Sequence, residues 1–354
     1  MVSLTVTVFQ VFAASAGNHA LALSMHGKKL GVEVNVVMPR HAPIMKINRC
    51  EELGANIIID GNDIGASREI ALRLAKERGG KYINGYDHID ILAGAGTVGL
   101  EIIDQVTNVD AVLVPVGGCG LIAGVAVAVK TLSPKTRVIG VASETCPALI
   151  RSLEKGEPVY TPTNPTLADG LAVPAIGVNA FRTLRNRVDE VISVPEHDIA
   201  IAILRLLEFE KVVCEGAGAI TIGALLSGKL NSLKGKKVVS ILSGGNIDTT
   251  SLGRCIDRGL AYDNRVIRFT VIIKDTPGDL SELCTLVSNC GASVKDIYLE
   301  RAYLRNDMSS IRVKMVTETR GLAHVEQIRS ALYNRYTQEK CTFRAFRQSS
   351  ENSF

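Results

Sequence analysis

The chain has 354 residues, 46% hydrophobic and 21% charged, which excludes a disulfide-stapled miniprotein, a disordered segment and a fibrous repeat. At about 150 residues per domain, this length predicts two domains. Lysine and arginine number 40 against 36 aspartates and glutamates, so the charge does not predict a nucleic-acid partner. Its 32 glycines and low aromatic content favour an α/β protein with many tight turns.

Cysteine and histidine spacing indicates neither a disulfide framework nor a zinc site. The eight cysteines form no Cys-x-x-Cys pair, and the six histidines lack zinc-ligand spacing. Several cysteines lie in apolar stretches, where a free thiol behaves as a small hydrophobic side chain. We therefore expect a reduced, cytoplasmic protein without a histidine-based metal site.

Two apolar segments resemble membrane-directed sequences. Residues 1–16 end in an Ala-Ser-Ala tripeptide like that of a secretory signal, but the first basic residue is Lys28, and alternating polar residues favour a buried strand. Residues 111–129 carry no charge, but Pro115 and four glycines divide them into a strand, a glycine loop and a helix. We expect no transmembrane helix.

Short β-branched runs alternate with helical patterns through the first 145 residues. The expected strands cover residues 6–13, 33–38, 56–59, 111–116 and 137–142. The expected helices cover residues 19–26, 43–53, 64–78, 93–106 and 121–132. A Pro- and Thr-rich loop at 158–174 precedes helices near 196–210 and 217–227 and a strand at 237–242. This succession predicts an α/β domain, residues 1–260, with a doubly wound, mostly parallel sheet.

The pattern changes from Val266 onward. Strands are expected at 267–273, 294–304, 311–316 and 342–346, with helices at 280–290 and 324–335. The resulting β-α-β-β-α-β order is that of a ferredoxin-like domain. We therefore expect a second domain at residues 266–347, followed by a disordered tail at 348–354.

The segment Ser-Ala-Gly-Asn-His-Ala at residues 15–20 follows a strand and opens a helix. Backbone amides at such a helix start, with a serine hydroxyl and an asparagine amide beside them, can bind an anion at the carboxyl end of a parallel strand. The same residues also fit an ordinary helix N-cap. Taken alone, this segment does not distinguish the two.

The segment Gly-Gly-Cys-Gly-Leu at residues 117–121 also follows a strand and precedes a helix. Glycines at such a turn let backbone amides approach a phosphate closely. A dinucleotide-binding loop is a rival interpretation, because Gly118, Gly120 and Ala123 match its loose fingerprint and Glu144 lies near the end of the next strand. A purely structural turn is a third.

Three further small-residue segments add weaker signals. Residues 243–246, Ser-Gly-Gly-Asn, follow a strand, and the serine hydroxyl can bind a ring nitrogen or cap a turn. Residues 214–219 start a helix with Glu215 in its first turn, which also suits the helix dipole. Asp169 and Gly170 lie in the 158–174 loop, which we interpret as carrying a site. Together these segments predict several strand-end loops at one rim.

In this order, the five motifs resemble those of the pyridoxal-phosphate-dependent serine/threonine ammonia-lyases, the threonine dehydratases of the tryptophan-synthase-β fold type (fold type II), to which serine racemase is a close relative. The resemblance covers residues 11 to 255. Residues 275–280, Asp-Thr-Pro-Gly-Asp-Leu, and the following Gly291 and Ala292 resemble the turns of an ACT regulatory domain.

The resemblance implies that the glycine loop holds the phosphate of pyridoxal 5′-phosphate. That loop consists of Gly117, Gly118, Cys119, Gly120 and Leu121. Cys119 departs from the usual all-glycine loop, at small cost if its φ angle is negative. The family often places a glutamate that binds a divalent cation at the position that is Ala142 in this chain. We therefore do not assign a metal site.

The resemblance also implies roles for polar residues around the cofactor ring. Asn18 would bind the pyridoxal 3′-oxygen, and Glu215 would lie beside the ring or the substrate amine. Ser243 would hydrogen-bond N1 of the pyridine, a neutral partner that suits β-elimination. The substrate carboxylate would be surrounded by Ser15, Gly17 and His19.

The resemblance fails at the Schiff-base lysine. The family carries it in a Ser-Phe-Lys-x-Arg-Gly-type motif roughly thirty residues before the Ser-x-Gly-Asn-His loop, where its amine later moves the Cα proton. Here that loop begins at Ser15 without a preceding lysine, and Lys28 and Lys29 fit solvated helix charges. We assign no catalytic residue and expect this polypeptide to be inactive or impaired.

The family reaction would make L-threonine or L-serine the substrate, with an allosteric amino acid at the ACT-like domain. We expect a homodimer or tetramer, because such domains usually pair, and neither a nucleic-acid nor a membrane partner. Two alternatives stay open. One is a non-catalytic, amino-acid-binding regulatory subunit, and the other is an NAD-dependent oxidoreductase that uses the loop at Gly118 and Gly120.

Overall fold

A computed structural model describes residues 9–302, 304 and 308–344. The predicted strand at 6–13 begins at Gln10, and its residues 6–8 lie outside the described residues, as do 345–347 and the expected tail at 348–354. The parallel α/β architecture predicted for the first part of the chain is confirmed. The strands, however, divide between two four-stranded sheets, which hydrophobic periodicity does not distinguish from one.

The small lobe contains a parallel sheet of order β3-β2-β1-β4. Its strands are β1 (Gln10–Ala14), β2 (Glu33–Met38), β3 (Asn56–Ile59) and β4 (Lys81–Tyr82). Its helices are α1 (Asn18–Leu30), α2 (Ile44–Glu52) and α3 (Ile64–Glu77). Val36 and Met38 are fully buried in its core.

The large lobe contains the second parallel sheet, of order β7-β6-β5-β8. Its strands are β5 (Ala111–Pro115), β6 (Arg137–Ser143), β7 (Glu190–Val194) and β8 (Val238–Ser240). Its α-helices are α4 (Ile89–Gln105), α5 (Gly120–Leu132), α6 (Ala148–Lys155), α7 (Val178–Leu184), α8 (Glu196–Arg205) and α9 (Gly216–Leu226). Short 3-10 turns are η1 (Asp169–Leu171) and η3 (Asn231–Leu233), and η2 (Leu206–Glu210) is a π-helix. β5 is buried on both faces, which explains its continuous apolar run.

The uncharged segment at 111–129 is divided as predicted, into β5, the glycine loop and the first part of α5. In the part of the chain that the structure describes, no helix combines the length and apolarity needed to cross a membrane.

The C-terminal unit is an antiparallel sheet of order β10-β11-β9-β12 with two helices. Its strands are β9 (Val266–Lys274), β10 (Ser293–Glu300), β11 (Ser310–Glu318) and β12 (Cys341–Arg344). Its helices are α11 (Asp279–Asn289), α12 (Leu322–Tyr336) and the 3-10 turn η4 (Gln338–Lys340). Val271, Val313 and Leu283 form part of a separate core, fully buried.

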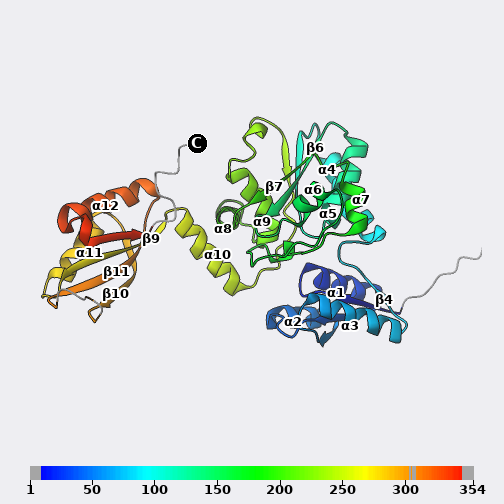
Figure 1. Ribbon diagram of the computed structural model, residues 1–354, viewed down its shortest axis with the longest axis horizontal. Helices are drawn as coiled ribbons and strands as arrows, with labels where there is room; N and C mark the ends of the chain where they lie inside the picture. The colour runs from blue at the N-terminus through cyan, green and yellow to red at the C-terminus, as the bar shows by residue number, and fades with distance from the viewer. Residues whose placement is uncertain (1–8, 303, 305–307, 345–354) are drawn as a thin grey trace, which may run out of the picture.

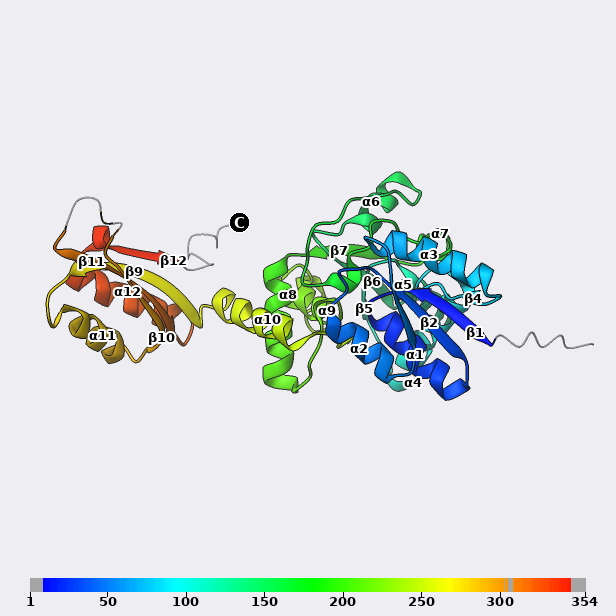
Figure 2. The same cartoon turned by 90° about the horizontal axis from the view of Figure 1, so that it is seen from below.

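The three units are arranged along the chain. The small lobe lies against the large lobe, and α10 (Thr249–Tyr262) leads away from the large lobe to the C-terminal unit, which stands apart in both views (Figures 1 and 2). All five motif segments of the sequence analysis lie in the two lobes, before α10. The C-terminal unit is attached to the large lobe through α10.

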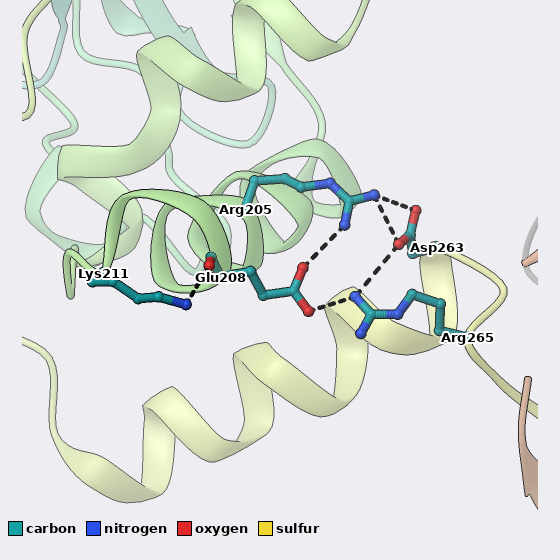
Figure 3. Close-up of polar contacts among 5 residues, drawn as sticks. All are labelled: Arg205, Glu208, Lys211, Asp263 and Arg265. Atoms are coloured by element: carbon teal, nitrogen blue, oxygen red, sulfur yellow. Dashed lines mark hydrogen bonds and ion pairs between the residues drawn. The ribbon is translucent and has the colours of Figure 1, made fainter. Parts of the chain in front are cut away.

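Charged side chains form a closed ring where α10 ends, and we call it the junction ring (Figure 3). Arg205 binds Glu208 at 3.1 Å and both oxygens of Asp263 at 2.8 Å. Arg265 binds Glu208 at 2.5 Å and reaches Asp263 at 3.9 Å. The ring joins η2 of the large lobe to the segment that enters β9.

Candidate active site

Loops from both lobes converge where the parallel strands end. α1 starts just after β1, the glycine loop (residues 117–120) just after β5, and residues 241–248 follow β8. The turn η1 and the start of α9 complete this set. In open parallel sheets, ligands bind at the carboxyl ends of the strands, so this rim is the candidate active site.

Asn18 and Glu215 meet across the two lobes. The Asn18 amide Nδ2 donates a hydrogen bond to Glu215 Oε1 at 2.5 Å, although the residues are 197 positions apart. Glu215 is only 5% exposed, and its backbone N–H donates to the Gly244 carbonyl at 3.2 Å. Burial raises the pKa of Glu215, and the Asn18 hydrogen bond opposes that effect. The structure thus brings two predicted site residues into direct contact.

Gly244 fits beside this pair because it has no side chain. A methyl group added there would collide with the Glu215 carboxylate and the Asn18 amide. Ser243, the preceding residue, is exposed in the same loop after β8. The predicted Ser-Gly-Gly-Asn segment therefore lies next to the Asn18–Glu215 contact, with its serine open to solvent.

The glycine loop packs against the connection between the lobes. A methyl group on Gly118 would collide with the Tyr86 ring, and one on Gly120 would collide with the Tyr86 backbone. Gly117 lies against η1, where its added methyl would be 3.0 Å from the Leu171 Cα atom. Only glycine, which has no side chain, fits this close packing at these three positions.

Cys119 adopts the left-handed conformation, with φ of 74°, so the condition of a negative φ is not met. The thiol is 3% exposed and lies 3.5 Å from the Gly117 carbonyl. The left-handed region costs a residue with a Cβ about 1–2 kcal/mol. The turn from β5 into α5 places the left-handed conformation at Cys119 itself, whereas the neighbouring glycines have no positive φ and are required by close packing.

The start of α5 can bind an anion. Among the described residues, no side chain caps the α5 N-terminus, which begins at Gly120, with Leu121 as its second residue. The first backbone N–H groups of a helix have no partner within the helix and carry the positive end of its dipole. Phosphate is the group that such a helix start and glycine loop bind most readily.

The other predicted residues around the start of α1, namely Ser15, Gly17 and His19, make local contacts within the small lobe. The Gly17 backbone N–H donates to the Ser15 hydroxyl at 3.1 Å. His19 Nε2 lies 3.2 Å from the Ile83 carbonyl, and burial lowers the pKa of His19. His19 therefore holds a neutral imidazole against the connection that leads to Tyr86.

Two residues that the sequence analysis did not select also lie at this rim. Tyr86 follows a two-residue strand, and no motif marks it. Lys46 is the third residue of α2 and bonds Asp169 of η1 at 3.2 Å. A cation in the first turn of a helix opposes the helix dipole. This unfavourable placement is the feature of the sequence that could have marked Lys46 as a residue with a role.

The residues around Ala142, where the family resemblance would place a cation-binding glutamate, do not form a cation site in the described structure. Ala142 is fully buried in β6, and Glu144 binds Lys229 at 3.1 Å. Within the described ranges, no three histidine, cysteine, aspartate or glutamate side chains gather where they could hold a metal ion.

Comparison with known proteins identifies close relatives. The profile of a family described as pyridoxal-phosphate dependent enzyme matches residues 8–244. The L-threonine ammonia-lyase of Thermotoga maritima is 41% identical over 322 residues, covering 91% of this chain and 80% of the relative.

Solved structures show the same similarity. The processed form of threonine deaminase isoform 2 from Solanum lycopersicum has a TM-score of 0.68 and 33% identity, over 71% of this chain and 74% of that one. Maize serine racemase has a TM-score of 0.66 and 31% identity, over 72% of this chain and 78% of that one.

Proposed function

This chain belongs to the family of pyridoxal-phosphate-dependent enzymes, and on that basis we propose that its site is built for the ammonia-lyase reaction of L-threonine, giving 2-oxobutanoate and ammonia, or of L-serine, giving pyruvate. The contact of Asn18 with Glu215 at 2.5 Å carries the proposal, because it joins the two lobes beside the loops expected to hold the cofactor. The named relatives support the substrate class.

The residues present fit pyridoxal phosphate. The start of α5 offers its phosphate backbone N–H groups that no described side chain caps, and Cys119, whose side chain is buried, is the one residue of segment 117–120 that is not glycine. We propose that Asn18 binds the oxygen of the cofactor ring and that Ser243 binds its nitrogen. Glu215, which accepts from Asn18, would lie beside the substrate amine. When bound, the cofactor supplies an electron sink for the bond broken at Cα.

The protein side chains then orient the reactants and hold protons. Asn18 is fixed by Glu215, so its amide is preorganised for an oxygen acceptor. Because burial raises the pKa of Glu215, this carboxyl group is a site where a proton can be held near the substrate amine. Ser15, Gly17 and His19 remain our proposal for the carboxylate end of the substrate.

We propose that the 354-residue polypeptide itself turns over substrate weakly or not at all. The reaction needs an amine to take the Cα proton, and none of the five motif segments of the candidate site contains a lysine. Lys28 and Lys29 are exposed on α1, whereas Lys46 is paired with Asp169. No catalytic residue is therefore assigned among them.

Incubation with pyridoxal phosphate and L-threonine tests both parts of this proposal. We expect cofactor binding without a visible band from a lysine-bound cofactor and without 2-oxobutanoate above the buffer level. Rapid 2-oxobutanoate release would contradict the proposed inactivity. A folded chain that does not bind the cofactor would contradict the proposed site.

The C-terminal unit supports a second proposal, an ACT-like regulatory domain that binds an amino acid. Its strand order and two helices fit that topology, and the match to the Thermotoga maritima enzyme spans 91% of this chain, so it extends into this unit. Calorimetric titration with isoleucine, serine and threonine tests it. Saturable heat from one of them is expected, and no heat from any would count against the proposal.

The remaining expectations are supported less directly. We propose a homodimer or tetramer, because the edge strand β10 exposes Ile297, Tyr298 and Leu299, and light scattering after size-exclusion chromatography tests it. All eight cysteines are free thiols, which suits a cytoplasmic location. The oxidoreductase alternative would use Glu144 for a ribose, and its pairing with Lys229 disfavours that role.

A further inference from the structure

The ion pair of Lys46 with Asp169 connects the two lobes at the rim of the candidate site. Lys46 lies on α2 of the small lobe, and Asp169 is the first residue of η1 in the large lobe. Lys46 Nζ and Asp169 Oδ2 are 3.2 Å apart. A charge pair between elements of two lobes acts on their relative position, unlike a pair within one helix.

Lys46 is unusually enclosed for a lysine on a short surface helix. Its side chain is 15% exposed, whereas that of Arg49 on the same helix is 67% exposed. The enclosure of Lys46 keeps its ammonium group beside Asp169, which is 62% exposed, and a partly enclosed charge pair is screened by solvent and salt less than an open surface pair. The pair therefore favours the closed arrangement.

The Asp169 end of the pair is held in place by its own lobe. Glu196 at the start of α8 accepts hydrogen bonds from the Thr166 hydroxyl at 2.5 Å and the Leu167 backbone N–H at 2.7 Å. These bonds fix the segment that leads into η1. Because η1 also packs on Gly117, the position of Asp169 is tied to the glycine loop.

The pair also lies next to the Asn18–Glu215 contact. A methyl group added at Gly170, the neighbour of Asp169, would be 3.8 Å from Glu215 Oε1. Separation of Lys46 from Asp169 would therefore move the two lobes apart where Asn18 reaches Glu215. Closure at this point holds α1 and α2 of the small lobe against α9 and η1, and η1 packs on Gly117 of the glycine loop.

We propose that Lys46 is a positioning residue, whose ion pair with Asp169 holds the small lobe closed over the glycine loop and keeps Asn18 in contact with Glu215. For its effect on the cofactor, this inference rests on the proposed function. The predicted closure of the lobes does not rest on the proposed function, because both charged residues of the pair belong to the chain itself.

Amide hydrogen exchange of the whole chain without cofactor tests the closure. In Lys46→Met and in Asp169→Asn, peptides covering α2 and residues 166–171 should exchange about fivefold faster, the effect expected for loss of one partly exposed pair. Arg49→Gln is the matched control, because Arg49 lies on the same helix and pairs with Glu52 within it. Its exchange should equal that of the wild type.

A charge swap separates closure from a local structural role. Lys46→Asp combined with Asp169→Lys should restore at least part of the protection that each single change removes, provided that thermal unfolding shows all variants folded. Wild-type exchange in Lys46→Met, equal acceleration in Arg49→Gln, or a swap worse than both single changes would overturn the proposal.

Release of pyridoxal phosphate supplies the second readout. Lys46→Met should release the bound cofactor about fivefold faster than the wild type does, and Arg49→Gln should not. Unchanged release together with faster exchange would overturn the link to the cofactor. If the wild type binds no cofactor, the proposed function fails, and the exchange experiment still decides the closure.

Discussion

At the scale of single residues, burial controls which groups can ionise. His19, Cys119 and Glu215 are all withdrawn from solvent, and in each of them burial is the largest influence on the pKa and favours the neutral form. The candidate site thus holds a neutral imidazole, a protonated thiol and a carboxyl group with a raised pKa.

Stability of the fold should depend on His19 between neutral and mildly acidic pH. Its pKa is lowered in the folded protein, so the unfolded chain binds the proton more readily. The stabilisation is complete above the unfolded pKa of about 6.5 and is lost as the pH falls. Urea unfolding at several pH values should show a flatter pH dependence in His19→Gln. The exposed His41→Gln should keep the wild-type slope, and equal slopes in all three proteins would contradict this assignment.

The Cys119 thiol should be unreactive in the native protein. It is 3% exposed, and burial raises its pKa, so little thiolate forms at pH 8. Mass mapping after iodoacetamide treatment should find label at the half-buried Cys284 and Cys290 first, and at Cys119 only after unfolding. Early labelling of Cys119 would show that the glycine loop opens.

At the scale of elements, the junction ring fixes an unusual helical turn. The π-helix η2 is a rare form that is often found at functional sites, and Lys211, with φ of 58°, ends it. Glu208 accepts from both Arg205 and Arg265 (Figure 3). The ring therefore connects two segments: residues 205–208, which lead toward Glu215, and residues 263–265, which lead into the C-terminal unit.

Removal of one ring member should weaken this junction. Burial alone would raise the pKa of Glu208, but its hydrogen bonds to Arg265 and Arg205 outweigh burial and lower it. The ring side chains are 22–35% exposed, so solvent screens their attraction, and we expect Arg265→Met to cost only about 1 kcal/mol. That corresponds to a Tm lower by roughly 2–4 °C.

Differential scanning calorimetry measures this change. Arg151→Met is the control, because Arg151 forms an exposed pair with Glu154 within α6, and its Tm should equal that of the wild type. Stabilisation by a carboxylate with a lowered pKa is complete above the unfolded Glu pKa of about 4.3 and is lost as the pH falls through the lower folded pKa, so the Tm difference between the two variants should shrink steadily as the pH falls below about 4. An Arg265→Met protein as stable as the wild type at pH 7 would contradict the role of the ring.

At the scale of the whole molecule, local patterns predicted the elements better than their grouping. The runs at 33–38 and 56–59 are β2 and β3 to the residue, because consecutive β-branched side chains mark both strands, the buried β2 and the half-buried edge strand β3. The division into two sheets was not predicted, since the carboxyl end of β4 carries no distinctive pattern. The sequence analysis also missed β4, β7, α6, α7 and α10. Of these, α10 carries a local signal, since Asp248 caps it by accepting from the Ser251 backbone N–H.

The candidate site was predictable in part for the same reason. Helix starts and glycine loops leave local signals, which located Asn18, Glu215 and the residues around Gly118. The contacts of Tyr86 with the glycine loop and of Lys46 with Asp169 depend on how the two lobes meet, and no local pattern contains that information. These long-range contacts are the ones that the structure added.

Calorimetric titration with pyridoxal phosphate tests the central claim, that the chain binds this cofactor on its glycine loop. We predict saturable binding to the wild type, with no comparable heat from NAD. Gly118→Ala, which would push a methyl group into Tyr86, should weaken binding about tenfold or more. Gly94→Ala, with open space around the new methyl group, should bind like the wild type. No binding of pyridoxal phosphate by the folded wild type, or equal binding by Gly118→Ala, would contradict the claim.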